Sequence, residues 1–343
     1  MEEILFQFGL DLEEFQVQSF GNGLINATWK ITGKQGNPKF ILQKVNQQIF
    51  KQPWDIASNT RLIDNYLKQH FPEYLFVSPV ASTAGDDLVK SDDGFYRLFP
   101  FIANSHTIDV VEEPQQAYEA ARHFARFTNY LSGFDAEQLK ITLPDFHNLS
   151  LRYQQFERSL ETGNPERIAR SKELIAAIKQ NKRIVDEFEI CKTGFTKRVT
   201  HHDTKISNIL FNAAGKGLCV IDLDTVMPGY FLSDVGDMMR TYLSPVSEEE
   251  KDFSKIIIRK EFYNAIVNGY LSEMGAVLTD TEKPYFHYAG EFMIYMQAIR
   301  FLTDHVNNDV YYGAKYEGHN FVRAGNQFTL LQHLQVHKNE MSV

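Results

Sequence analysis

The chain has 343 residues, of which 43% are hydrophobic and 23% are charged, and its formal net charge is −9. This length exceeds what one ordinary hydrophobic core accommodates, so two domains are expected. The acidic balance argues against nucleic acid or an anionic membrane as the main partner. Two cysteines without a CxxC pair argue against a disulfide framework and against a cysteine zinc site.

The sequence shows no sign of export or membrane insertion. Its start, MEEILFQFGL, is acidic and lacks the basic residues and long apolar core of a signal peptide. No uninterrupted apolar run approaches the ~20 residues that cross a bilayer. We expect a cytoplasmic protein without nucleic-acid or membrane partners, and either a monomer or a weak homodimer.

The first hundred residues are predicted to be rich in β-structure. Strand patterns run from Phe15 to Val45 and are broken by the glycine turn FGNGLINAT and the hairpin tip GKQGNP. Apolar residues at helical spacing, with Pro53 in the first turn, predict a helix over 53–69. Further strands are expected near 76–81, 86–90 and 94–102.

The rest of the chain is predicted to be mostly helical. A helix over 112–131 has alanine and phenylalanine on one face and Gly133 as its stop signal. Helical periodicity continues over 148–189, 234–243, 249–273, 282–306 and 319–336. We therefore predict an α+β protein with a β-rich domain over residues 1–103 and a helical domain over 104–343.

A polar loop between two apolar runs carries the residues best suited to chemistry. It reads HHDTKISNILFN over 201–212, and GLCVIDLDT follows over 217–225. Phosphoryl transfer needs a carboxylate to deprotonate the attacking hydroxyl, oxygen ligands for Mg²⁺ and positive charge on the phosphates. Asp203 is the candidate base, and Lys205 is the candidate holder of the moving phosphoryl group.

The neighbouring polar residues fit metal binding and support of this loop. Asn208 and Asp222 offer an amide oxygen and a carboxylate, which are hard ligands suited to Mg²⁺. His201 is expected to brace the loop, and Asp234 to cap a helix and brace the same loop. Asp224 either touches a second Mg²⁺ or caps a turn. Taken singly, such residues are also common in turns, because Asn and Asp bond their own backbone.

The loop HHDTKISN resembles the protein-kinase catalytic loop H-R-D-L-K-x-x-N, with Asp222 in the place of the DFG aspartate. The pattern HxDxxxxN followed by I-D-L-D-T, without the DFG glycine, is more similar to the aminoglycoside phosphotransferase and choline kinase group. The resemblance covers residues 15–103 and 197–244. It implies a protein-kinase-like bilobal fold: a small antiparallel β-lobe with one main helix, and a larger helical lobe. ATP and Mg²⁺ are the cofactors that it implies.

The resemblance also implies a nucleotide site in the β-lobe. Lys44, at the end of FILQK, stands where these folds keep a phosphate-binding lysine, although a solvent-facing strand lysine is the alternative. Its usual glutamate partner is not evident, since 53–69 contains no Glu. The glycine loop fits phosphates or a plain hairpin turn equally well, and RLFPFI resembles the hinge that meets adenine. The expected nucleotide-binding residues are Gly21, Gly23, Asn26, Thr28, Lys44, Pro100, Phe101 and Ile102.

Within this group the sequence most resembles the N-acetylhexosamine 1-kinases, through FILQKVNQQIF, LPDFHN and residues 298–327. This resemblance implies transfer of the γ-phosphoryl group of ATP to the anomeric hydroxyl of N-acetylglucosamine or N-acetylgalactosamine. The candidate sugar-binding residues are Phe146, His147, Arg300, Asp304 and Tyr311. Arg300 and Asp304 could instead form an exposed ion pair one helical turn apart, and the aromatic residues could be ordinary core.

Two other functions stay open at this point. One is phosphorylation of another small alcohol, such as choline, homoserine or an aminoglycoside-like compound. The other is nucleotide binding without catalysis, against which the presence of Asp203, Asn208 and Asp222 argues.

Overall fold

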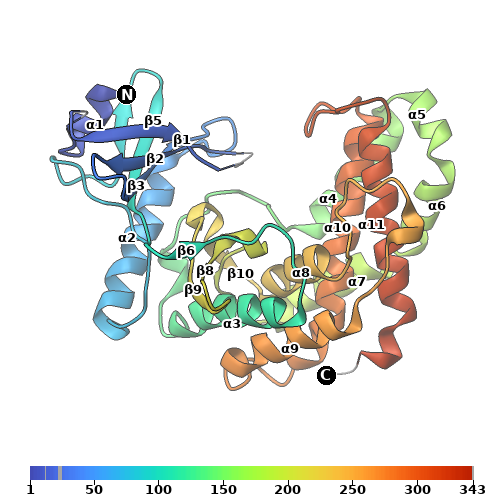
Figure 1. Ribbon diagram of the computed structural model, residues 1–343. Coiled ribbons are helices and arrows are strands. Elements are labelled where there is room, and N and C mark those ends of the chain that lie inside the picture. Colours follow the sequence, from blue (N-terminus) through green and yellow to red (C-terminus); the bar gives the residue numbers. More distant parts are fainter. Residues whose placement is uncertain (12, 22–24, 342–343) are drawn as a thin grey trace. The chain divides into compact units, whose positions relative to one another are not determined.

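The computed structural model describes residues 1–11, 13–21 and 25–341, and its chain forms two compact units (Figure 1). The first unit comprises Met1–Thr107, Tyr130–Pro144 and Asn208–Pro228, and the second comprises Ile108–Asn129, Asp145–Ser207 and Gly229–Val343. Two later segments thus belong with the first hundred residues, and the division between residues 103 and 104 stays a prediction. The predicted α+β architecture is confirmed.

The first unit is built on a five-stranded antiparallel sheet in the order β1-β2-β3-β5-β4. One face packs Ile31, Leu42 and Leu98 against α1, and the other packs Val45 and Phe95 against α2. The elements are α1 (Glu2–Gln7), β1 (Phe15–Ser19), β2 (Ala27–Gly33), β3 (Pro38–Val45), α2 (Pro53–His70), β4 (Val89–Ser91) and β5 (Gly94–Pro100).

The register of β3 and β5 determines which polar side chains share a face of this sheet. Gln43 lies opposite Arg97, and Lys44 lies opposite Tyr96. Successive side chains of a strand point to opposite faces. Lys44 and Tyr96 are therefore on the same face as Leu42, towards α1, whereas Gln43 and Arg97 point to the other face.

A second, three-stranded sheet of the first unit has the order β6-β8-β9. Its strands are β6 (Ser105–His106), β8 (Ile209–Asn212) and β9 (Gly217–Val220), and β10 (Met227–Gly229) then leads into the second unit. Ile209 pairs with Val220, and the Ile221 N–H donates to the Asn208 carbonyl at 2.9 Å. This hairpin brings Asn208 and Asp222 to the same end.

The second unit is helical and is organised around α10, which is buried along almost its whole length. Helix α10 lies beside α11 and also packs on α8 and α4 (Figure 1). Gly236 permits the close approach of α8, because a Cβ there would lie 2.4 Å from the Ala289 carbonyl oxygen. The elements are α3 (Pro114–Tyr130), α4 (Leu149–Thr162), α5 (Pro165–Arg170), α6 (Lys172–Gln180), α7 (Arg183–Gly194), β7 (Arg198–Thr200), α8 (Phe231–Tyr242), α9 (Lys260–Met274), α10 (Phe286–Val306) and α11 (His319–Val336).

Several predicted elements differ from the structure: the long helical region expected over 148–189 is divided into α4, α5, α6 and α7. The strand expected over 76–81 is reduced to one bridge between Val80 and Leu98, in a segment where Pro79 cannot donate to a ladder. The helix expected over 249–273 begins only at Lys260. Before it, the Asp252 carboxylate accepts the Ser254 N–H, a local bond that competes with helix formation.

Buried histidines predict acid sensitivity of the second unit. Burial lowers the pKa of His287 and His305 in α10 below their ordinary value near 6.5. Below that pH the unfolded chain takes up protons that the folded chain does not, so the free energy of unfolding falls as pH falls. We expect a loss of up to about 1.4 kcal/mol per histidine between pH 7 and pH 5.5, measured by urea denaturation. His287→Phe should reduce this pH dependence and His106→Gln, at an exposed position, should not; equal slopes in both variants would contradict the prediction.

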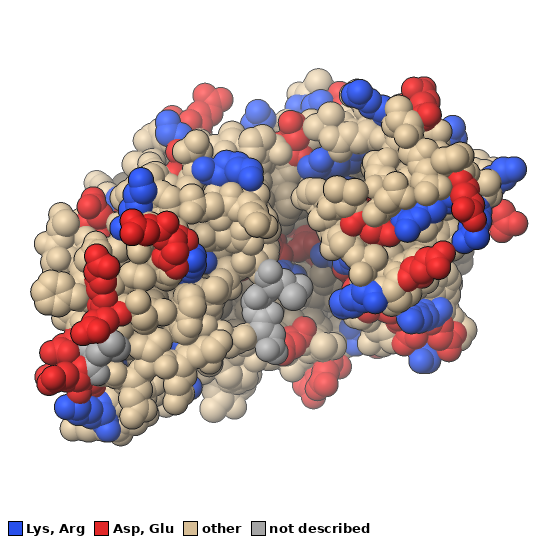
Figure 2. Space-filling view, turned by 90° about the horizontal axis from the view of Figure 1, so that it is seen from above, with Lys and Arg blue, Asp and Glu red and all other residues tan. Residues whose placement is uncertain are grey.

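Charged side chains of both signs are interspersed over the face seen in Figure 2. Among the described residues, no helix has the length and apolar character that a membrane crossing requires.

Candidate active site

The polar loop after β7 is held in the second unit by two carboxylates of α8. Asp234 accepts the backbone N–H groups of His201 at 3.1 Å and His202 at 2.7 Å, and Asp237 accepts that of Thr204 at 2.8 Å. Burial raises the pKa of Asp234 to about 7, and the two N–H donors oppose that rise. The predicted N-cap role of Asp234 is wrong, because α8 begins at Phe231 and Asp234 lies inside its first turn.

Asp203 and Lys205 lie at the accessible side of this loop. The Lys205 Nζ is 3.0 Å from Asp203 Oδ2, and the two side chains are 44% and 20% exposed respectively. His201 is fully buried, edge-on to Phe124 with ring centroids 5.0 Å apart, and its Nδ1 accepts the Asp203 N–H at 3.3 Å. An acceptor hydroxyl can therefore reach Asp203, whereas His201 supports the backbone.

Several supports of the loop were not predicted from the sequence. The Tyr242 hydroxyl donates to the Thr204 carbonyl at 2.5 Å. The Arg240 guanidinium forms ion pairs with Asp237 at 3.0 Å and with Glu248 at 2.8 Å. The available signal was the spacing within SDVGDMMRTY, which places Asp234 and Asp237 one helical turn apart.

Asn208 and Asp222 fit a Mg²⁺ site of the first unit. Asn208 is 5% exposed, while Asp222 is exposed and has left-handed backbone with φ 60°. Mg²⁺ is commonly held by one or two protein oxygens together with substrate phosphates. Among the described residues, no cluster of three His, Cys, Asp or Glu would hold a metal by itself. The two residues therefore suit a metal that arrives with a nucleotide.

Asp224 is buried in the first unit and is fully engaged by protein groups. Its Oδ1 pairs with Arg97, and its Oδ2 accepts from Asn26 Nδ2 at 2.8 Å. Asn26 Oδ1 accepts the Asn46 N–H at 3.0 Å, and Gln43 Oε1 accepts from Arg97 Nη2 at 2.8 Å. The predicted nucleotide residue Asn26 thus serves a buried network.

Lys44 does not join this network. Its Nζ lies 2.8 Å from Asp93 Oδ2, which also accepts from the Tyr96 hydroxyl at 2.8 Å. The hydrogen bond with Asp93 raises the pKa of Lys44. Because the strand turns Lys44 away from the face of Gln43 and Arg97, this placement argues against the predicted phosphate-binding role.

The other nucleotide candidates have mixed environments. Gly21 has φ 77°, which favours glycine, and Gly23 lies outside the described residues. Thr28 Oγ1 accepts from Gln43 Nε2 at 3.4 Å. Within the expected hinge, the Phe101 N–H donates to the Lys39 carbonyl at 2.9 Å, and the Ile102 carbonyl accepts from Ser105 at 2.7 Å. Adenine would therefore need the Ile102 N–H or the carbonyls of Pro100 and Phe101.

Four of the predicted sugar-binding residues come together in the second unit. The rings of Phe146 and His147 stack at 4.3 Å, and His147 lies 5.4 Å from His202, which precedes Asp203. The Arg300 guanidinium lies 5.9 Å from the Phe146 ring and 5.9 Å from the Tyr311 ring. A path of neighbouring side chains thus runs from the catalytic loop to Tyr311, which is 73% exposed. We call Phe146, His147, Arg300 and Tyr311 the acceptor cluster.

Asp304 has a different position from the one predicted. It is 4% exposed and accepts the N–H groups of Tyr311 at 2.7 Å and Tyr312 at 2.9 Å. It therefore holds the loop that carries Tyr311, and its role in sugar binding stays a prediction. Arg300, its alternative partner, contacts Gln297 Oε1 at 3.3 Å and the Tyr312 ring at 5.5 Å, two residues that were not predicted from the sequence.

The acceptor cluster carries the positive charge of Arg300, and the Arg152 guanidinium lies within its influence. Desolvation, and then the charge of Arg300, lower the pKa of Arg152. Burial, followed by the charges of His202 and Arg300, holds the pKa of His147 well below its ordinary value. A polycationic ligand would be repelled here, whereas hydrogen-bond acceptors would be favoured.

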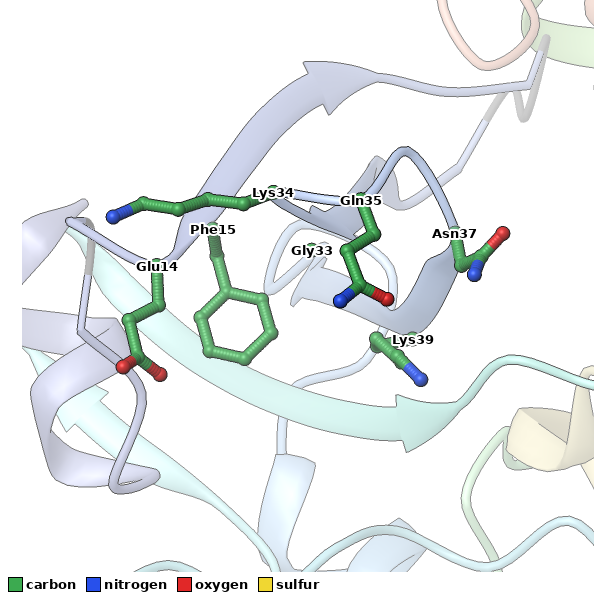
Figure 3. Close-up of a pocket in the computed structure, with 7 residues that line it drawn as sticks. All are labelled: Glu14, Phe15, Gly33, Lys34, Gln35, Asn37 and Lys39. Atoms are coloured by element: carbon green, nitrogen blue, oxygen red, sulfur yellow. The ribbon is translucent and has the colours of Figure 1, made fainter.

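A separate pocket of about 330 Å³ lies on the first unit and contains none of the predicted site residues (Figure 3). It is open to solvent, and we assign it no role. Its lining residues are Glu14, Phe15, Gly33, Lys34, Gln35, Asn37 and Lys39.

Comparison with known proteins gives both a family and a fold. The family described as "Phosphotransferase enzyme family" matches residues 16–277. A microcompartment-associated aminopropanol kinase matches with TM-score 0.64 and 13% identity, covering 99% of this chain and 97% of that chain. An aminoglycoside phosphotransferase from Alicyclobacillus acidocaldarius matches with TM-score 0.61 and 12% identity, covering 99% of this chain and 96% of that chain. A spectinomycin phosphotransferase solved with ADP and spectinomycin matches with TM-score 0.58 and 12% identity, covering 97% of each chain. The protein-kinase-like fold expected from HHDTKISN is thereby confirmed.

Proposed function

Because this chain belongs to the phosphotransferase enzyme family, we propose that it transfers the γ-phosphoryl group of ATP to a sugar hydroxyl. The proposed acceptor is the anomeric hydroxyl of N-acetylglucosamine or N-acetylgalactosamine. Membership of this family identifies the chain as a small-molecule phosphotransferase, and the sugar as acceptor is what we propose in addition. The observation that carries this addition is the positive, aromatic acceptor cluster next to the loop of Asp203.

Asp203 is the proposed general base. Its carboxylate is accessible and takes the proton of the acceptor hydroxyl as the oxygen attacks phosphorus. An anomeric hydroxyl is more acidic than an ordinary alcohol, so a carboxylate is a sufficient base. Lys205, whose Nζ lies 3.0 Å from Asp203, stays close enough to attract the transferring phosphoryl group.

The first unit is proposed to hold the nucleotide. Adenine meets the backbone of Pro100–Ile102, and the loop that includes Gly21 covers the phosphates. Mg²⁺, held by Asn208 and Asp222, would neutralise charge on the phosphate oxygens. Lys44 is left out of this assignment, since its partner is Asp93.

The acceptor cluster suits a neutral sugar that carries a carbonyl group. Aromatic rings pack on the apolar faces of a sugar, and the Arg300 guanidinium donates to carbonyl and hydroxyl oxygens. The positive charge of Arg300, beside Phe146 and Tyr311, disfavours a polycationic aminoglycoside. An acetamido group supplies a carbonyl that the guanidinium can bind.

The test is a panel of acceptors incubated with the protein, ATP and Mg²⁺, with ADP release as the readout. We expect N-acetylglucosamine or N-acetylgalactosamine to raise ADP release well above the rate without acceptor, and choline, homoserine and aminoglycosides to have little effect. Faster release with one of those alcohols than with either sugar would overturn the sugar assignment. If none of the acceptors raises ADP release while the protein still binds ATP, the non-catalytic alternative is favoured.

Arg300→Gln is expected to raise the KM for the N-acetylhexosamine about 10- to 100-fold and to leave the KM for ATP within about twofold. The change removes a charged donor, whose hydrogen bonds are worth about 1.5–3 kcal/mol. Steady-state kinetics with each substrate varied in turn measures the effect. Arg158→Gln, an exposed position on α4, is the matched control. A rise in the KM for ATP alone would place Arg300 on the nucleotide side.

A further inference from the structure

The first unit contains a buried ion pair, Arg97–Asp224, that the proposed reaction does not use. The two side chains are 6% and 2% exposed. Burial of two charges carries a large desolvation cost, which only excellent geometry and additional hydrogen bonds offset. A pair that meets those conditions beside a predicted metal ligand therefore calls for a functional explanation.

The pair is completed by two amide side chains. Asp224 Oδ1 pairs with Arg97 Nη1, and Asp224 Oδ2 accepts from Asn26 Nδ2 at 2.8 Å. Gln43 Oε1 accepts from Arg97 Nη2 at 2.8 Å and from Arg97 Nε at 3.1 Å. Both oxygens of Asp224 are thus occupied by protein donors. We call Asn26, Gln43, Arg97 and Asp224 the Arg97 network.

The Arg97 network joins two parts of the predicted nucleotide site. Asn26 ends the glycine-containing loop and is fixed to the next loop through the Asn46 N–H at 3.0 Å. Asp224 is the central residue of the short 3₁₀ turn Leu223–Thr225, which directly follows Asp222. Asp222 itself has left-handed backbone with φ 60°, a conformation that a non-glycine residue keeps only when its surroundings hold it.

We propose that Arg97 is a positioning residue that acts through Asp224 to aim the Asp222 carboxylate at the metal–nucleotide complex. In this arrangement Asp224 is an anchor and not a metal ligand. The inference rests on the proposed function, since it assumes a metal–nucleotide complex in the first unit.

Arginine is needed at this position because its planar fork contacts two partners at once. The guanidinium holds Gln43 through two nitrogens and Asp224 through a third. A lysine ammonium is a point charge on a flexible stem and does not reproduce that fork. Arg97→Lys therefore keeps the charge but loses the geometry.

The experiment measures ADP affinity by titration calorimetry, with Mg²⁺ and with EDTA, in full-length variants. The quantity of interest is the gain in affinity that Mg²⁺ produces. We expect Arg97→Lys and Asp224→Asn each to reduce this gain about tenfold or more, as partners of metal ligands do. The double variant should resemble the single ones. Asp222→Ala, which removes the ligand, should abolish the gain.

The matched control is Arg61→Lys, in a two-nitrogen arginine–aspartate pair of the same unit whose arginine is 46% exposed. It should leave the gain unchanged. Gln43→Leu is the second variant. Because it spares the ion pair, it tests the network even if Arg97→Lys does not fold. It should reduce the Mg²⁺-dependent gain in ADP affinity by about threefold. A normal gain in Gln43→Leu, or in folded Arg97→Lys, would overturn the proposal.

Two further outcomes separate the alternatives. If Mg²⁺ no longer raised the ADP affinity of Asp224→Asn but raised that of Arg97→Lys normally, Asp224 would be a metal ligand. That result would overturn its role as an anchor. A wild-type protein without any Mg²⁺-dependent gain would overturn both this inference and the ATP assignment. If neither sugar raised ADP release but the calorimetry gave the expected ADP affinities, only the assignment of the sugar acceptor would be overturned.

Discussion

Asp203→Asn is expected to lower kcat roughly 10³-fold and to change the affinity for ATP by less than about threefold. Asparagine keeps the shape of the side chain but cannot take the proton of the attacking hydroxyl. The affinity for ATP should survive, because Asp203 and its partner Lys205 belong to the second unit, whereas the proposed nucleotide residues belong to the first. Single-turnover kinetics and ATP titration measure the two quantities separately.

The control for this prediction is Asp280→Asn, which makes the same chemical change at a fully exposed position of the second unit. It should retain the wild-type kcat. If Asp203→Asn kept most of the turnover and lost ATP affinity instead, Asp203 would be a nucleotide residue and the base would have to be sought elsewhere.

The catalytic loop could be predicted from the sequence because its residues are close together in the chain. Asp203, Lys205 and Asn208 fall within one motif, and Asp222 lies just after β9. The supports of the loop were harder to predict. Asp237 and Tyr242 act on Thr204 from more than thirty residues away, and a carboxylate that accepts backbone N–H groups leaves little trace in the sequence.

The face on which Lys44 lies follows from strand parity. FILQK ends with a glutamine and a lysine, and residue type favoured the lysine. The side-chain period of a strand is two residues, so neighbours point to opposite faces. Leu42 is buried on the face towards α1, and Lys44 must share that face. Gln43 is therefore the residue that meets Arg97.

The acceptor cluster joins residues that are about 150 positions apart. Resemblance alone indicated Phe146, His147, Arg300 and Tyr311, and the structure places them together. It also gives Asp304 a different task, because that carboxylate accepts two backbone N–H groups of the loop that carries Tyr311. Residue type alone cannot distinguish a carboxylate that binds a ligand from one that shapes a loop.

Arg198→Met is expected to lower the free energy of unfolding by about 3–5 kcal/mol. Arg198 donates to both carboxylate oxygens of Glu282, at 2.6 Å and 2.8 Å, and the two side chains are 7% and 0% exposed. Removal of the arginine leaves a buried carboxylate whose donors are the backbone N–H groups of Thr196 and Thr279 and the Thr279 hydroxyl. Urea denaturation followed by circular dichroism measures the loss.

A second substitution separates the buried charge from the lost packing. Adding Glu282→Gln removes the charge and keeps one oxygen that accepts from either Thr196 or Thr279, so the double variant should regain part of the lost free energy. Arg170→Met, in an exposed pair whose partners are 65% and 71% exposed, should cost no more than about 0.5 kcal/mol. If the double variant were no more stable than Arg198→Met, lost packing and not charge would explain the effect. Because Arg198 opens β7, which leads directly to His201, the same pair anchors the strand from which the catalytic loop departs.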